Sequence, residues 1–386
     1  MKTKAQFLFI TIFLFLFFLS TFILSTEART QGSHKAGWKG EITTENEVKV
    51  VKNPQEPLYG ELVFDLEEDL SIGREDDENY MFHMVRGIAL DSQHNIYVTD
   101  WGHYRIQKFD KNGNYLQTIG RHGQGPGEFE HTMQLRIEDL TGNLYIRDGL
   151  HEIEKFDKKG NYIEKIRLAK AIDNFDFDGR GNFIALQHTV TDEDLSKILC
   201  KVNSNGEIIE NYVKYPWPIH YQKKGESRTV GYDPEAYCLI MSKLNKEAFV
   251  YGYSRDYGLN IIDTDGRVLF KIKKDESPKR FSAGEKRIYK KYHYDLQPYK
   301  PFFYSIIIDS QGRIYVQSNR TFNKDFKLNR EIDIFSKDGY FLYKTTIPRG
   351  TYIIKDGFLY AYVMNEDSGE ELVKRNRIKN WDQIKY

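Results

Sequence analysis

The strongest constraint on the fold of this chain is the pattern in residues 86–129, RGIALDSQHNIYVTDWGHYRIQKFDKNGNYLQTIGRHGQGPGEF. Four short apolar runs alternate there with turn-forming residues: Ile88–Leu90, Ile96–Val98, Ile106–Phe109 and Tyr115–Ile119. The turns between them are rich in Asp, Asn and Gly, which tolerate the backbone geometry of tight turns. This pattern predicts four short antiparallel strands. Four strands in about 45 residues is the size of one blade of a β-propeller.

Two features of this segment recur along the chain. The first is a hairpin turn that reads apolar, turn-former, two polar residues, Gly, any residue, apolar, and it begins at residues 109, 156, 202, 262 and 335. Its Gly is expected because a tight hairpin turn needs a positive φ angle. The second is an Asp-led turn before a strand, which begins at residues 91, 139, 178 and 309. Two markers that recur in the same order predict a ring of repeated blades and disfavour a generic sandwich.

The two ends of the chain are expected to share the last blade. The C-terminal region supplies three strands, and a single strand at residues 60–66 has no hairpin partner beside it. Because an open ring exposes two sheet edges that invite aggregation, we expect strand 60–66 to pair with the last blade. The sequence therefore predicts an all-β, six-bladed β-propeller over residues 56–386, after a polar linker at residues 29–55. Ser282 and Glu285 form a capping box that predicts one short helix in an insertion.

The first 28 residues have the pattern of an export signal. A short basic region precedes residues 7–24, which are almost wholly Phe, Leu and Ile, and Ser25–Ala28 follows. The apolar run also reaches the length of a membrane span, so two outcomes stay open: cleavage after Ala28, or an uncleaved anchor formed by residues 5–25. In either case we expect export to the periplasm or the cell exterior, with membrane contact only through this segment.

Charge and cysteine content limit the classes of partner and site. The chain has 56 basic and 56 acidic residues, so it offers no global electrostatic attraction for nucleic acid. We expect a monomer whose partner is a protein or peptide, a glycan or a small molecule. Cys200 and Cys238 are either two buried thiols or a disulfide, and neither has zinc-like spacing to a second Cys or His.

The most regular repeat resembles the NHL repeat. The resemblance is carried by IYVTDWGHYRI at 96–106, FDKNG at 109–113 and GRHGQGPGEF at 120–129. It is strong over residues 82–166 and partial over 172–272 and 302–378, where the turn Asp and the Arg-Ile pair are missing. The whole chain resembles exported bacterial six-bladed β-propeller proteins, mostly of unassigned activity. The wider group includes lactonases, lyases and ligand-binding scaffolds, so the resemblance does not choose a function.

Candidate ligand-binding residues come from the loops that a propeller gathers around one mouth of its channel. They carry basic, imidazole or flat aromatic side chains: Arg86, Trp101, His103, His122, Arg136, Arg147 and His188. Arg forms bidentate hydrogen bonds with carboxylate or phosphate, and Trp offers a flat face to a sugar or peptide. Asp100 and Arg105 belong to the repeat itself and are expected to be structural.

These residues are compatible with two functions. The favoured one is a binding or scaffold module for a peptide, glycan or small anionic ligand at the channel mouth, and the alternative is a lactonase- or lyase-like enzyme there. No catalytic residue is assigned, because no histidine pair has a fixed short spacing and no Gly-x-Ser-x-Gly motif occurs. No metal or cofactor is expected; the alternative left open is a calcium or other divalent ion in the channel, and calcium would need several converging carboxylates and amides. The acidic run from Asp173 to Asp178 predicts a polar channel lining or a turn.

Overall fold

The computed structural model describes residues 35–191, 194–217, 220–224, 227–231, 237–291, 296–322, 328–347, 352–365 and 368–385. The predicted export signal at residues 1–28 lies outside this part of the chain. Within the described ranges, no helix has the length and apolar character needed to cross a membrane. Residues 40–386 form one compact unit.

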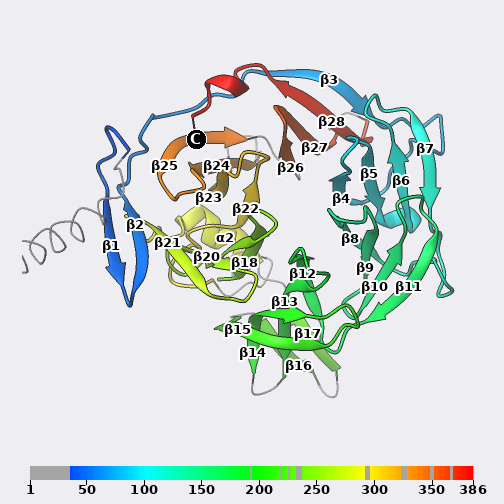
Figure 1. Ribbon diagram of the computed structural model, residues 1–386, viewed down its shortest axis with the longest axis horizontal. Helices are drawn as coiled ribbons and strands as arrows, with labels where there is room; N and C mark the ends of the chain where they lie inside the picture. The colour runs from blue at the N-terminus through cyan, green and yellow to red at the C-terminus, as the bar shows by residue number, and fades with distance from the viewer. Residues whose placement is uncertain are drawn as a thin grey trace, which may run out of the picture. The chain divides into compact units, whose positions relative to one another are not determined.

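Six blades of four antiparallel strands surround a central channel, with the first strand of each blade nearest the channel (Figure 1). The first blade consists of β4 (Val85–Leu90), β5 (Ile96–Asp100), β6 (Arg105–Phe109) and β7 (Tyr115–Ile119). The second consists of β8 (Thr132–Ile137), β9 (Leu144–Asp148), β10 (Glu152–Phe156) and β11 (Tyr162–Arg167). The third consists of β12 (Ile172–Phe177), β13 (Phe183–Val190), β14 (Leu195–Val202) and β15 (Ile208–Pro216).

The second half of the ring repeats this plan. The fourth blade contains β18 (Leu239–Lys243), β19 (Ala248–Tyr253), β20 (Gly258–Asp263) and β21 (Val268–Lys274). The fifth contains β22 (Ser305–Ile308), β23 (Ile314–Phe322), β24 (Leu328–Phe335) and β25 (Phe341–Ile347). The sixth contains β26 (Tyr352–Lys355), β27 (Phe358–Met364), β28 (Glu371–Ile378) and β3 (Leu66–Ile72). The predicted fold class, an all-β six-bladed propeller, is confirmed.

The strand that completes the last blade lies later in the sequence than predicted. β3 pairs antiparallel with β28, with Ile72 opposite Val373 and Leu66 opposite Ile378. The predicted bounds of 60–66 are therefore wrong, because residues 58–62 instead run beside β25 of the fifth blade. Charge complementarity explains this choice of strand, since acidic side chains of β3 face basic ones of β28. The ammonium of Lys374 lies 2.9 Å from the Glu68 carboxylate.

The predicted linker at residues 29–55 is wrong over its second half. Residues 41–53 form a hairpin of β1 (Glu41–Glu45) and β2 (Val48–Asn53). β2 pairs in parallel with β21, so the fourth blade becomes a sheet of six strands. The carboxamide of Asn53 donates to the Gly339 carbonyl oxygen at 2.8 Å and accepts from the Phe341 N–H, which ties the hairpin to the fifth blade.

Local turn and cap predictions are confirmed. Gly113 adopts a φ of 83°, and the Asp110 carboxylate accepts the backbone N–H groups of Asn112 and Asn114. The helix α2 (Ala283–Lys291) begins at the predicted capping box: the N–H of Ser282 donates to Glu285, and the N–H of Glu285 donates to the Ser282 hydroxyl. A second hairpin, β16 (His220–Lys224) with β17 (Ser227–Gly231), lies between the third and fourth blades in sequence.

The apolar cores lie between neighbouring blades. One cluster joins Ile88 and Phe109 of the first blade to Tyr360 and Val373 of the sixth. Each sheet therefore buries both faces, which matches the high content of Tyr, Phe, Ile and Val. The two cysteines are free thiols: Cys200 is buried, and burial raises its pKa to about 12, while Cys238 is partly exposed.

Candidate functional site

A cavity of about 690 Å³ occupies the central channel and is lined by the first strands of all six blades. Cavities of this size accommodate small organic ligands. The wall carries many polar and charged side chains in the second to fourth blades. It also carries Ile307 of β22 and Ile353 of β26, which are only partly buried.

Two β-bulges place charged residues in this wall. In β4 the register against β5 shifts at Arg86, and in β12 the register against β13 shifts at Asp173. A bulged residue leaves the regular ladder, and its side chain is re-aimed. Both residues line the cavity. The acidic run from Asp173 to Asp178 divides as predicted: Asp173 and Asp176 line the channel, whereas Asp178 accepts backbone N–H groups in a turn.

The lining carries five cationic side chains and three carboxylates. The cationic residues are Arg86, Arg136, Arg147, Lys243 and Lys355. Each carboxylate already has a cationic partner: Asp176 lies 3.1 Å from Arg136 Nε, and Asp139 lies 2.8 Å from Lys243 Nζ. Asp173 is paired with His188 and Lys197. Among the described residues, Arg86, Arg147 and Lys355 have no carboxylate within ion-pair distance.

Arg147 is the most unusual of these cations because it is buried, with only 7 % of its surface exposed. One guanidinium N–H donates to the Gly149 carbonyl oxygen at 2.7 Å, while Nε has no hydrogen-bond partner in the described part of the chain. Burial lowers the pKa of Arg147, Asp173 acts against that shift, and Arg136 adds to it. A buried charge without a paired opposite charge is unfavourable. An anion in the cavity would relieve that cost.

His188 reaches the cavity only through Asp173. Its Nδ1 lies 3.0 Å from one Asp173 oxygen, and Lys197 Nζ lies 2.7 Å from the other. The Lys197 ammonium also lies 4.5 Å from the centre of the Trp217 ring, a cation–π contact. Burial raises the pKa of the Asp173 carboxyl, but the hydrogen bond from His188 and the charge of Lys197 outweigh burial and hold the pKa below its usual range.

This depressed pKa predicts how stability depends on pH. The stabilisation by Asp173 is fully present above the unfolded-state pKa of about 3.9 and is lost as the pH falls toward the lower folded-state pKa. At pH 7, Asp173→Asn should cost about 2 kcal/mol, since hydrogen bonds to a charged group contribute about 1.5–3 kcal/mol. Urea unfolding between pH 7 and pH 3 should show the difference between wild type and variant shrinking below pH 4. The exposed Asp65→Asn control should show no such trend, and a constant difference for Asp173→Asn would contradict the assignment.

The structure separates the seven predicted ligand-binding residues into three groups. Arg86, Arg136 and Arg147 line the cavity together. Two further residues are connected to the cavity by one contact each: Trp101 has the Arg86 guanidinium 5.1 Å from its ring centre, and His188 contacts Asp173.

His103 and His122 do not line the channel cavity. His122 packs against Tyr104, with ring centroids 4.3 Å apart and ring planes tilted by 45°. His103 lines a second cavity between the sixth and first blades. Sequence reasoning missed Lys243 and Lys355, which stand at the ends of β18 and β26. Their sequence position could have identified them, because each lysine ends the first strand of a blade, directly before the turn to the second strand.

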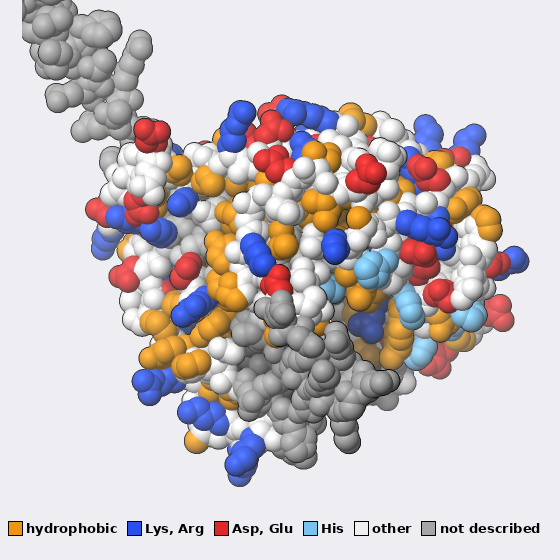
Figure 2. Space-filling view, turned by 90° about the horizontal axis from the view of Figure 1, so that it is seen from below, with side chains coloured by type: hydrophobic (Ala, Val, Ile, Leu, Met, Phe, Trp, Pro, Cys, Tyr) orange, Lys and Arg blue, Asp and Glu red, His pale blue; other side chains and the backbone are white. Residues whose placement is uncertain are grey.

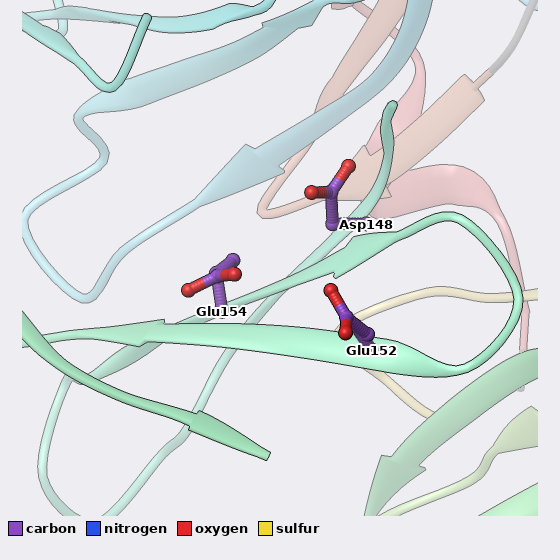
Figure 3. Close-up of side chains that lie close together, drawn as sticks. All are labelled: Asp148, Glu152 and Glu154. Carbon is purple, nitrogen blue, oxygen red and sulfur yellow. The ribbon is translucent and has the colours of Figure 1, made fainter. Parts of the chain in front are cut away.

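An acidic cluster lies in the second blade, away from the channel wall. Carboxylate oxygens of Asp148, Glu152 and Glu154 come within 4.8 Å of one another (Figure 3). Lys165 Nζ lies 2.9 Å from Glu152 and 3.0 Å from Glu154, so a lysine already supplies the positive charge there. Asp148 also accepts the backbone N–H groups of Glu130 and His131. Each of the three carboxylates is therefore engaged by a contact within the protein.

The ring and its channel define a six-bladed β-propeller. A family model described as "6-bladed beta-propeller" matches residues 76–251. No curated protein matches the sequence. The NHL-repeat subtype stays a prediction.

Solved structures share this fold at low sequence identity. One is a protein described as exported, from Bacteroides fragilis, with 12% identity, a TM-score of 0.55, and coverage of 86% of this chain and 99% of that chain. Another is a member of the DUF4221 family from Bacteroides vulgatus, with 12% identity, a TM-score of 0.52, and coverage of 82% and 98%. A streptogramin B lyase reaches a TM-score of 0.44 at 12% identity, with coverage of 81% and 98%. The likenesses to the two Bacteroides proteins concern the fold and do not transfer an activity.

Proposed function

We propose that the protein is an extracytoplasmic binding module that holds an anionic ligand in its channel cavity. The ligand would be a small molecule, or the acidic part of a peptide or glycan. The observation that carries the proposal is Arg147, a buried guanidinium that lines the cavity without a carboxylate partner in the described chain. Arg86 adds to the same wall a second guanidinium that has no carboxylate partner among the described residues. Arginine favours carboxylate and phosphate because its N–H groups match their oxygens in pairs.

Two further observations support binding over catalysis. The cavity carboxylates are engaged by Arg136, Lys243, Lys197 and His188, so they neutralise neighbouring charges. The group of three acidic side chains within metal-binding distance lies elsewhere, where Lys165 already contacts two of them. The lactonase- or lyase-like alternative therefore has no specific observation in its favour among the described residues.

The proposed location rests on the N-terminal sequence and on the exported character of a structural neighbour. Residues 1–28 have the pattern of an export signal, and the Bacteroides fragilis protein of similar fold is described as exported. We propose periplasmic or extracellular placement, with the choice between a cleaved signal and a retained anchor left to measurement. Mass spectrometry of the mature N-terminus distinguishes the two.

Anion binding is tested by titration calorimetry with D-glucuronate, citrate and inorganic phosphate, using glucose as the neutral comparison. At least one anion should bind, and Arg147→Gln should weaken it by tenfold or more, since a charge-assisted hydrogen bond contributes about 1.5–3 kcal/mol. The matched control is Arg167→Gln, because the Arg167 side chain is 84% exposed.

A stability measurement separates loss of the ligand site from misfolding. Arg147→Gln removes an unpaired buried charge, so its melting temperature should equal or exceed that of the wild type. Anion binding that survives Arg147→Gln unchanged, or no binding by any of the three anions, would refute the proposed function.

A further inference from the structure

A second cavity, of about 460 Å³, lies between the sixth and first blades and brings two histidines together. His83 precedes β4, and His103 ends the short 3-10 helix η1 (Trp101–His103). Their ring centroids are 6.0 Å apart, with an angle of 57° between the ring planes. Glu75 and Glu370 line the same cavity. Figure 2 shows several histidine side chains close together on one side of the molecule.

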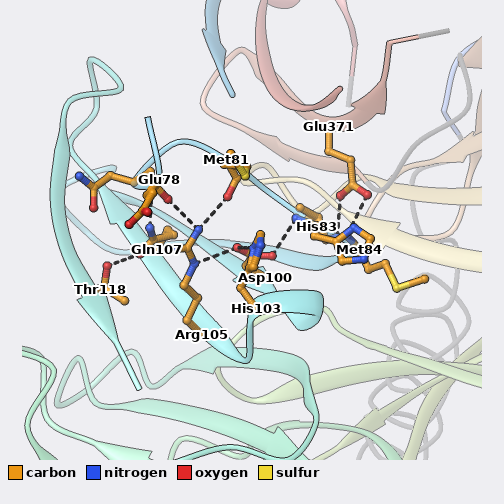
Figure 4. A network of polar contacts seen from close by, with 12 residues as sticks. Glu78, Met81, His83, Met84, Asp100, His103, Arg105, Gln107, Thr118 and Glu371 are labelled. Carbon is orange, nitrogen blue, oxygen red and sulfur yellow. Dashed lines mark hydrogen bonds and ion pairs between the residues drawn. The ribbon is translucent and has the colours of Figure 1, made fainter. Parts of the chain in front are cut away.

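One buried carboxylate, Asp100, contacts the ring of His103, the backbone of His83 and the guanidinium of Arg105 (Figure 4). Asp100 is completely buried; one oxygen accepts the His83 backbone N–H at 2.9 Å, and the other contacts His103 Nδ1 at 2.8 Å. When Nδ1 donates its proton to this carboxylate, Nε2 of His103 is left as a free lone-pair donor. The same arrangement of carboxylate and imidazole orients histidine ligands in metal sites and increases their basicity.

The backbone around both histidines is held in an uncommon conformation. Met84, directly after His83, has a φ of 58°, and Tyr104, directly after His103, has a φ of 55°. Non-glycine residues in this region carry strain, which clusters at functional sites. Gly102 allows the close approach, because a Cβ there would lie 2.2 Å from His83 Cδ2 and 2.7 Å from the His83 carbonyl oxygen.

The nearby charged groups leave the two imidazoles available. Both oxygens of Glu371 accept backbone N–H groups, from Met84 at 2.8 Å and from Val85 at 2.9 Å. Arg74, the cation of this cavity, is paired with Asp77 at 2.8 Å. Within the described chain, His83 has no hydrogen-bond partner on its ring nitrogens, and His103 has none on Nε2.

We propose that His83 and His103 bind a divalent transition-metal ion of the imidazole-preferring kind, such as Zn²⁺ or Cu²⁺. A metal about 2.0–2.1 Å from one nitrogen of each ring is compatible with ring centroids at the observed separation. Imidazole suits Zn²⁺ and Cu²⁺, whereas Mg²⁺ and Ca²⁺ prefer oxygen ligands. Glu370, in the loop before β28, lines the same cavity and offers a carboxylate as a third ligand. The ion would then link the last blade to the first.

The test uses the full chain without a polyhistidine tag, after dialysis against a chelator. Calorimetric titration with ZnCl₂ should show one ion per chain, and CaCl₂ should not compete. His83→Gln and His103→Gln should each weaken Zn²⁺ binding at least tenfold. The matched control is His94→Gln, in the turn between β4 and β5, which should bind Zn²⁺ as the wild type does.

Two additional readouts make the result decisive. Zn²⁺ should raise the melting temperature of the wild type but not of either variant, since a ligand that binds only the folded state stabilises it. Cu²⁺ electron paramagnetic resonance should show coupling to two imidazole nitrogens. His83→Gln keeps the contacts of Asp100, because His83 bonds to it through the backbone, so this variant should fold even if His103→Gln does not. No Zn²⁺ binding by the wild type, or wild-type affinity in His83→Gln, would overturn the proposal.

Discussion

Replacing Asp333 by asparagine is expected to lower the free energy of unfolding by about 3 kcal/mol, because it leaves a buried lysine without its closest charge partner. Lys274 Nζ lies 2.8 Å from Asp333 Oδ2, and both side chains are nearly inaccessible to solvent, at 2% and 3% exposed. The hydroxyl of Tyr257 donates to the same carboxylate, and burial, followed by the charge of Asp333, raises the Tyr257 pKa well above its usual value. These groups join the fourth blade to the fifth.

The expected loss lies at the lower end of the range of about 3–5 kcal/mol for broken buried pairs. Lys274 retains Glu276, whose carboxylate lies 2.9 Å away and is 22% exposed. Urea denaturation at pH 7 measures the effect. The matched control is Glu68→Gln, which breaks the exposed pair with Lys374 and should cost less than about 1 kcal/mol.

A double variant distinguishes loss of a partner from general damage to the core. Adding Lys274→Met to Asp333→Asn removes the stranded charge, so part of the lost stability should return. An Asp333→Asn variant as stable as Glu68→Gln would contradict the role assigned to the buried pair.

A chain that begins at Arg74 is expected to lose cooperative folding altogether. It lacks β3, so β28 would expose an unpaired edge and the sixth blade would have three strands. Ile72, which is 1% exposed, would also be missing from the core between the sixth and first blades. The ring would then be open at the interface that joins its two ends.

A longer truncation provides the control for that prediction. A chain that begins at Pro57 keeps β3 and the residues beside β25 but lacks the hairpin β1–β2. It should unfold cooperatively at a reduced temperature, because it loses the hydrogen bonds of Asn53 to the fifth blade. Differential scanning calorimetry compares the two. A sharp transition of similar enthalpy in the chain that begins at Arg74 would show that closure by β3 is dispensable.

The outcome for the N-terminal region shows where sequence reasoning failed. The run at residues 60–66 has a strand-like pattern, yet it lies beside the fifth blade, while the acidic β3 completes the sixth. Strand partners depend on charges and edges that lie far away in sequence, such as Lys374 and Arg375 on β28. The same reason explains the hairpin at 41–53, whose partner β21 is more than 200 residues away.

The candidate site was predictable in residue type but not in arrangement. Arg86, Arg136 and Arg147 were expected at the channel mouth and do line its cavity. His103 was expected to join them and instead faces a different cavity with His83. The sequence near His103 places it in the loop between β5 and β6. The opposite wall of its cavity comes from residues 369–371, which lie far away in sequence.

The sequence by itself determined the blade: short strands, turns led by Asp with Gly at positive φ, the capped helix and the number of repeats. These features depend on backbone preferences within a few residues, which the chain carries wherever it folds. Only the tertiary structure decided which charges have no carboxylate partner among the described residues, such as Arg147 in the channel, and which are matched, such as Lys274 with Asp333. Burial and pairing depend on side chains brought from different blades, because the electrostatic cost of a charge depends on the neighbours that packing brings to it.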